Sequence, residues 1–121
     1  MATMNSIIEY VDRVKPNVYE ATDKYRWLSK VEGVISAEVH GMAEPVTLAI
    51  PADADKELLV PAPYDDVYAF YLCAMIDFHN QDYEDYNNAA QLFGEHLELY
   101  KKYYIRQHGG GSAKNFRNVM G

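Results

Sequence analysis

Seven apolar or aromatic side chains near the end of the chain restrict its fold more than any other feature. They follow one another at intervals of three and four residues, the spacing of one side of an α-helix: Tyr83, Tyr86, Ala90, Phe93, Leu97, Tyr100 and Tyr104. Only a short polar link, His79 to Asp82, separates this seam from the apolar segment before it. The pattern predicts a long helix that folds back on its predecessor as an antiparallel hairpin.

The preceding segment is predicted as a helix from about Pro63 to Asn80. Proline suits the first position of a helix, and Asp65 and Asp66 would place negative charge in the first turn, where the helix dipole favours it. The buried stripe of this helix is expected to consist of Val67, Phe70, Tyr71, Ala74, Met75 and Phe78.

Two further helices are expected in the N-terminal third of the chain. Asn5 or Ser6 can cap a short helix that ends before Pro16. A longer helix is predicted from Thr22, a suitable N-cap, to Gly41, a suitable C-terminal cap. Its apolar residues keep helical spacing throughout: Trp27, Leu28, Val31, Val34, Ile35 and Val39.

Residues 42–62 cannot continue a helix, because several prolines interrupt them. Within this segment Val46, Leu48 and Ile50 alternate with Thr47 and Ala49, as the residues of an extended strand do. We therefore expect a long loop or a short β arm here. A connection of this length tends to be functional, and contact with a neighbouring subunit is the use we expect.

The length of 121 residues, with 49% apolar and 24% charged residues, suits one all-α domain. We expect a small four-helix bundle over residues 1–108, with residues 42–62 inserted between its second and third helices. The run Gly109 to Gly111, followed by Ser112, ends the helical pattern. Residues 109–121 are therefore predicted to form a flexible tail.

Charge is distributed unevenly along the chain. The net charge is −7, yet only cations follow Tyr100, namely Lys101, Lys102, Arg106, Lys114 and Arg117. These give residues 101–121 a charge of +5 and leave −12 on the first hundred residues. An acidic body disfavours wrapping of DNA, so only the C-terminal end is expected to approach nucleic acid. No secretory leader or membrane span is evident, which predicts synthesis in the cytoplasm and no membrane contact.

Motifs for catalysis are weak. A di-iron site in a helical bundle would need Glu-x-x-His, but the residues three positions before the four histidines are Ala37, Ile76, Phe93 and Ile105. The glycine run is not followed by the Lys-Ser/Thr pair of a phosphate-binding loop. We predict no enzymatic activity, cofactor or metal.

Other chemically notable residues have ordinary structural explanations. Asp82, Glu84 and Asp85 would open the last helix, where negative charge is favoured, and a cation site is the weaker alternative. His79 lies near a helix end, where solvation and the dipole favour it over a metal-binding or proton-transfer role. Cys73 lies in an apolar stretch and is expected to be a buried thiol.

One feature of the composition does point to binding. The chain contains 11 tyrosines, a residue that is enriched where subunits meet. A base-stacking platform is the alternative use of the aromatic seam, but it would need a basic groove beside the rings.

A further set of segments is characteristic of a known family. They are Tyr25-Arg26-Trp27-Leu28, Glu32-Gly33, Glu57-Leu58-Leu59-Val60-Pro61-Ala62-Pro63-Tyr64-Asp65-Asp66-Val67-Tyr68, Tyr71-Leu72, Ile76-Asp77, Tyr86-Asn87-Asn88, Phe93, Tyr100, Tyr103-Tyr104 and Arg106. Together they resemble the head-tail connector (adaptor, or head-completion) proteins of tailed bacteriophages, found in siphophage genomes. The resemblance covers about residues 5–108, and residues 58–68 are its most specific part.

The resemblance implies a helical virion protein at the head-tail interface. Identical subunits would form a dodecameric ring under the portal protein, above a stopper or tail-completion protein. DNA would pass through the channel without sequence-specific binding. The inter-subunit arm would use Val46, Leu48, Ile50, Leu58, Leu59 and Val60, and portal docking would use Tyr100, Tyr103, Tyr104, Arg106, Phe116 and Arg117.

Three other functions stay open at this point. The chain could be a stopper or tail-completion protein of the same assembly. It could also be a small helical regulator that binds one partner through a tyrosine-rich surface. A helical metalloenzyme is the least supported, because the ligand spacing is missing.

Overall fold

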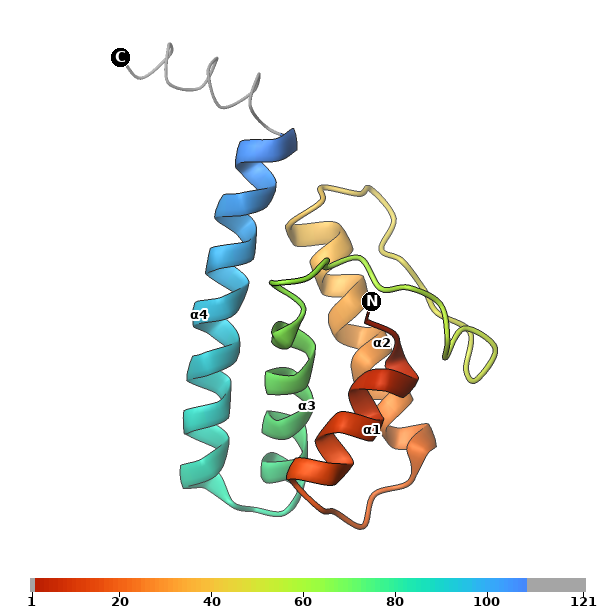
Figure 1. Cartoon of the computed structure of the whole chain (residues 1–121), viewed down its shortest axis with the longest axis vertical. Helices are drawn as coiled ribbons and strands as arrows, with labels where there is room; N and C mark the ends of the chain where they lie inside the picture. Colours follow the sequence, from red (N-terminus) through yellow and green to blue (C-terminus); the bar gives the residue numbers. More distant parts are fainter. Residues whose placement is uncertain (1, 109–121) are drawn as a thin grey trace.

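The computed structural model describes residues 2–108 and contains four α-helices in that range (Figure 1). They are α1 (Met4–Val14), α2 (Ala21–Glu38), α3 (Asp66–His79) and α4 (Tyr83–His108). The all-α prediction is confirmed. No β-strand forms among the described residues, so the extended pattern of Val46, Leu48 and Ile50 belongs to an irregular loop. The tail prediction for residues 109–121 lies outside the described part of the chain.

Helices α1 and α2 begin at other residues than predicted. Thr3 caps α1: its Oγ1 accepts the Ser6 backbone N–H at 3.0 Å, and the Ser6 hydroxyl accepts the Thr3 N–H at 2.9 Å. These reciprocal bonds satisfy two backbone N–H groups that have no partner within the helix. The N-cap is therefore Thr3, and the predicted caps at Asn5 and Ser6 are wrong. Helix α2 begins at Ala21, with Glu20 rather than Thr22 as its N-cap.

Helix α3 also begins later than predicted. Pro63 does not occupy its first position, because single turns precede the helix: the Tyr64 N–H bonds to the Pro61 carbonyl at 2.9 Å and the Val67 N–H to the Tyr64 carbonyl at 3.3 Å. The N-cap is Asp65.

Helix α3 lies at the centre of the molecule. It packs against α1, α2 and α4, whereas the backbone of α4 does not come close to that of α1 or α2 in the described range. Figure 1 shows α4 along one edge, with α1, α2 and the long loop on the other side of α3. A tight turn at Asn80–Asp82, with a left-handed Gln81 (φ 62°), reverses the chain between α3 and α4. Figure 1 shows that α2 and α4 run in the same direction and that α3 runs opposite to both.

The buried side of α3 differs from the predicted stripe. Val67 and Ala74 are buried as predicted, but Phe70, Tyr71 and Met75 are half-buried and Phe78 is 46% exposed. The fully buried residues Tyr68, Leu72 and Ile76 lie on another side of the helix. Phe70, Tyr71 and Phe78 instead pack on aromatic side chains of α4, where they stay partly open to solvent.

The loop between α2 and α3 contributes directly to the core. Leu48, Ala54, Leu58 and Val60 are at most 5% exposed. Leu48, Leu58 and Val60 each contribute on the order of 1.5–3 kcal/mol by this burial, which offsets the entropy of ordering an irregular segment. The loop is therefore anchored in the folded body at these four residues.

Candidate functional site

A buried hydrogen-bond network fixes the loop to two helices. The Glu32 carboxylate, 2% exposed on α2, accepts the Leu59 backbone N–H at 2.7 Å and the Tyr68 hydroxyl at 2.6 Å. The Tyr68 oxygen in turn accepts the Val60 N–H at 2.9 Å. Burial raises the pKa of the Glu32 carboxyl, against the opposing effect of these two hydrogen bonds. Burial, followed by the neighbouring carboxylate, also raises the pKa of the Tyr68 hydroxyl.

A second anchor lies one turn further along α2. The buried Ser36 hydroxyl donates to the Gly33 carbonyl at 2.7 Å and accepts the Val46 N–H at 2.8 Å. A Cβ atom on Gly33 would lie 3.2 Å from the Val46 carbonyl oxygen, so the loop crosses α2 where the helix has no side chain. The loop is held along α2 by backbone contacts at this close approach.

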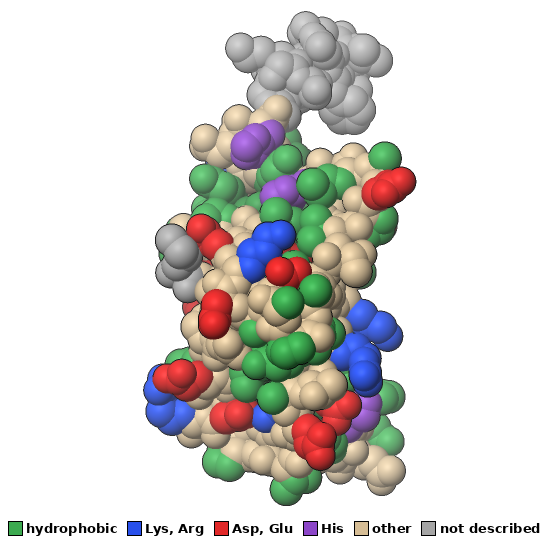
Figure 2. All heavy atoms as spheres, turned by 90° about the vertical axis from the view of Figure 1, so that its right-hand side faces the viewer, with side chains coloured by type: hydrophobic (Ala, Val, Ile, Leu, Met, Phe, Trp, Pro, Cys, Tyr) green, Lys and Arg blue, Asp and Glu red, His purple; other side chains and the backbone are tan. Residues whose placement is uncertain are grey.

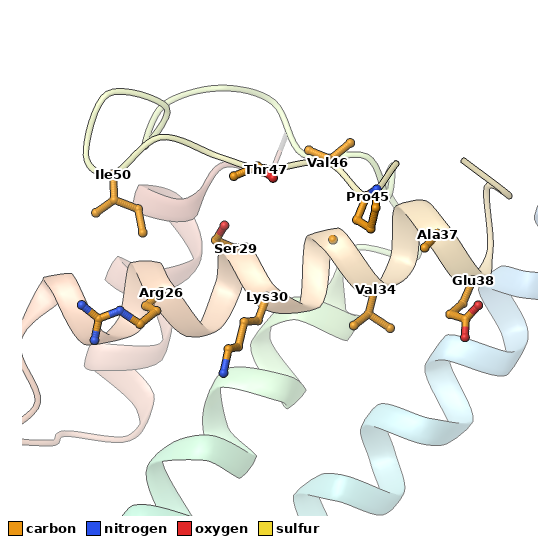
Figure 3. A pocket seen from close by; sticks show the side chains of 11 residues that line it. Arg26, Ser29, Lys30, Val34, Ala37, Glu38, Pro45, Val46, Thr47 and Ile50 are labelled. Carbon is orange, nitrogen blue, oxygen red and sulfur yellow. The ribbon is translucent and has the colours of Figure 1, made fainter. Parts of the chain in front are cut away.

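Between these anchors and solvent, α2 and the loop enclose an open groove of about 570 Å³ (Figure 3). Its chemistry changes along α2, from Arg26 and Lys30 at one end, through Val34, to Glu38 at the other. Pro45, Val46, Thr47 and Ile50 form the loop side. Val34 is 53% and Ile50 38% exposed, so apolar surface remains open between charged ends. A groove of this kind suits a helix or an extended segment of a protein partner.

Helix α4 presents a second open surface. Only Ala89 and Tyr100 of its 26 residues are buried. The predicted seam packs on α3, for instance through Phe93 against Tyr71, with ring centroids 5.3 Å apart. Leu92, Leu99 and Ile105, outside the seam, are 40%, 53% and 53% exposed.

An aromatic cluster joins the C-terminal half of α4 to His40, two residues beyond the end of α2. His40 Nε2 lies 2.7 Å from the Tyr100 hydroxyl, and the His40 ring stacks on Tyr104 at 4.2 Å. Tyr103 packs on Tyr64 at 4.7 Å. Burial lowers the pKa of His40, and the charge of His108 lowers it further. Burial is also the main cause that raises the pKa of Tyr100 to about 12.

The proposed docking residues therefore differ in accessibility. Tyr100 is only 2% exposed and serves the core, Tyr103 and Tyr104 are half-buried, and Arg106 is exposed. Phe116 and Arg117 lie outside the described residues.

The proposed arm residues also divide into two groups. Leu48, Leu58 and Val60 are buried within the chain's own core, and Leu59 is half-buried with its N–H on Glu32. In this conformation the side chains of Leu48, Leu58 and Val60 offer nothing to a neighbour. Val46 and Ile50 line the groove and stay accessible.

The candidate metal and thiol residues have structural roles in this arrangement. Carboxylate oxygens of Asp77, Asp82 and Asp85 lie within 4.8 Å of one another, but the buried Asp77 already pairs with Lys15 at 2.8 Å. Cys73 is half-buried rather than buried, and desolvation raises the pKa of its thiol. A raised pKa reduces the thiolate fraction and makes this cysteine a poor nucleophile.

Sequence reasoning gave Glu32 no structural role, and it missed Ser36 and the outer stripe of α2. The stripe has a visible signal, because Lys30, Val34 and Glu38 are four residues apart. On the loop side, Val46 and Ile50 had been named as arm residues, but no pattern in the sequence indicated that the loop would place them beside α2.

Comparison of the chain with protein-family models, with curated proteins and with solved structures gives no match. Within residues 2–108, none of the helices combines the length and apolar character that a bilayer span requires. On the face seen in Figure 2, acidic, basic and apolar side chains are interspersed.

Proposed function

We propose that this chain is a structural assembly protein, the adaptor subunit of a phage head-tail connector. In this proposal, residues 1–108 act as a small four-helix connector domain, and identical subunits form a ring beneath the portal. The loop of residues 42–62 takes part in subunit contacts through its accessible residues, and the region from about Tyr100 onward docks on the portal. The work is done by geometry and binding rather than by catalysis.

One observation carries the proposal: α4 is a long helix covered on a single side. Its only helix partner among the described elements is α3, and Leu92 and Leu99 on its open side are 40% and 53% exposed. These leucines are seven residues apart and therefore share one side of the helix. Aligned apolar side chains that the chain itself leaves open mark a surface for another protein.

The resemblance and the charge distribution support the phage assignment in particular. The most specific resembling segment, residues 58–68, is the segment that the Glu32 network fixes in place. The first hundred residues carry a charge of −12, and an acidic channel wall would let DNA slide without sticking.

The test is the absolute mass of the purified protein, by light scattering on a sizing column, alone and mixed with the portal protein from the same genome. The proposal expects co-elution with the portal at about one copy per portal subunit. A matched pair of variants locates the docking end: Arg106→Ala should weaken co-elution, whereas Arg13→Ala, on the exposed side of α1, should not.

Two outcomes would overturn the proposal in favour of an alternative. Binding to the portal only after another connector protein has joined would identify a stopper or tail-completion protein. A stable monomer or dimer that ignores the portal in both conditions would identify a regulator.

A further inference from the structure

We infer that the groove on α2 of one subunit receives the outer side of α4 of the next subunit, with the two helices parallel. The facing pairs are Lys30 with Glu95, Val34 with Leu99, and Glu38 with Lys102. This inference rests on the proposed function, because it names the surfaces through which identical subunits would meet.

The first half of the contact is a stripe on α2. Lys30, Val34 and Glu38 follow one another at intervals of four residues and are all exposed. In order along the helix they are cationic, apolar and anionic. Within the described range neither Lys30 nor Glu38 forms an ion pair, so both charges are available to a partner.

The second half is a stripe on α4 with the opposite order of charge. Glu95, Leu99 and Lys102 are exposed and lie at intervals of four and three residues, again on one side of a helix. Glu95 accepts a hydrogen bond from Gln91 at 3.1 Å, and neither Glu95 nor Lys102 is in an ion pair in the described structure. An anion, a leucine and a cation therefore match the cation, valine and anion of α2 only when the helices run parallel.

The fold supplies that direction. Helices α2 and α4 of one subunit both run from the lower to the upper end of the molecule in Figure 1. Rotation about an axis along this direction, as in a ring, preserves it. The α2 of one subunit and the α4 of the next would therefore also be parallel.

The fold also places the two stripes at similar heights along the common direction of the helices. His40, two residues beyond α2, bonds to Tyr100 and stacks on Tyr104, so this position is level with the turn of α4 around Lys102. Counting back along two parallel helices of equal rise places Glu38, Val34 and Lys30 within about one turn, roughly 5 Å, of the levels of Lys102, Leu99 and Glu95. A rotation between subunits without translation along the axis therefore brings the members of each pair to similar levels, and a tilt of one helix against the other can remove the remaining difference.

The positions of the two surfaces favour closure into a ring over a two-fold dimer. They lie on different helices that do not touch, with α3 between them (Figure 1). Each subunit therefore uses one surface toward each neighbour, which is a heterologous contact. Such contacts close into a ring when the rotation between subunits divides a full turn.

Charge reversal with rescue tests the pairing. Lys30→Glu places an acid opposite Glu95, and Glu95→Lys places a cation opposite Lys30. Each change replaces attraction by repulsion and should weaken assembly on the portal by at least about tenfold at low salt. The double variant Lys30→Glu with Glu95→Lys restores the pair in reverse and should recover most of the loss. The matched control is Arg13→Glu with Glu9→Lys, at exposed positions of α1, which should assemble as the unaltered protein does, singly and together.

A cross-link tests the apolar pair without the portal. In a Cys73→Ala background, a chain with both Val34→Cys and Leu99→Cys should give a ladder of covalent multimers with a short bis-maleimide. Each single cysteine variant should stay monomeric, as should a chain with Val18→Cys and Leu99→Cys, since Val18 is 90% exposed but off the stripe.

The outcomes separate the inference from the proposed function. Portal binding that survives both charge reversals, with no ladder, overturns this contact and leaves the connector function standing. A ladder without portal binding supports the contact and overturns the connector function. Failure of the double reversal to recover assembly, although each single reversal disrupts it, would contradict the Lys30 to Glu95 pair.

Discussion

Glu32 on α2 and Tyr68 on α3 share a hydrogen bond of 2.6 Å across the core, although they are thirty-six residues apart in the chain. The same two side chains hold the backbone N–H groups of Leu59 and Val60. The network therefore connects the two helices with the loop that separates them in sequence. The position of the loop, and with it the groove on α2, depends on these two side chains.

Replacing Tyr68 by phenylalanine tests this network. Tyr68→Phe removes the hydroxyl and leaves the buried Val60 N–H and one Glu32 oxygen without a partner, which should lower the free energy of unfolding by about 1–3 kcal/mol. Urea denaturation measures the change. Tyr10→Phe is the control, because Tyr10 is 48% exposed and its hydroxyl is expected to contribute little. Equal stability of the two variants would contradict the role of the network.

Glu32 should also make stability depend on pH. Its folded-state pKa is raised above the ordinary value of 4.5, chiefly by burial. The folded protein therefore holds this proton more tightly than the unfolded chain, so the contribution of Glu32 is fully present below that ordinary value. It is lost as the pH rises through the raised folded-state pKa. Glu32→Gln does not titrate, so the stability of the wild type relative to this variant should fall with rising pH in that window.

Unfolding free energies of both proteins across a pH series from about 4 to 8 provide the measurement, since the window opens near the ordinary glutamate pKa. Parallel pH profiles for the two proteins would show that Glu32 is not the titrating group.

The Ser36 anchor should act locally. Ser36→Ala removes the acceptor of the Val46 N–H and should cost roughly 1 kcal/mol, with faster hydrogen exchange at the Val46 amide. Exchange at amides in the middle of α3 should follow the global stability alone. Ser29→Ala, also beside the groove, is the matched control. Unchanged exchange at Val46 would mean that the serine does not hold the loop.

Alanine substitutions at Tyr100 and Arg106 should affect different properties, stability in the first case and portal binding in the second. Tyr100 is 2% exposed, so Tyr100→Ala should lower the free energy of unfolding by about 3–5 kcal/mol, as other large core truncations do. Arg106 is exposed, so Arg106→Ala should change stability by less than about 0.5 kcal/mol while it weakens portal binding. Thermal unfolding and the portal co-elution assay separate the two effects. A Tyr100→Ala protein with unchanged stability would contradict the burial of Tyr100 between α4 and the core.

The periodic segments were predictable because helical spacing is a local property. The seam from Tyr83 to Tyr104 identified α4, which begins at Tyr83 and packs on α3. Helix starts were less accurate, since Thr3, Asn5 and Ser6 are all good capping residues and only the reciprocal Thr3 and Ser6 bonds select among them.

The sequence by itself determined that the chain is all-helical, that prolines interrupt it between Gly41 and Asp66, and that α3 and α4 are joined by a short turn. These features follow from backbone geometry and from the periodicity of apolar residues. Only the tertiary structure decided that Glu32 and Tyr68 are paired, that Leu58 and Val60 belong to the core, and that Val34 lines an open groove. The physical reason is that burial depends on which distant segments share the same space, and an irregular loop has no periodicity that reveals this in advance.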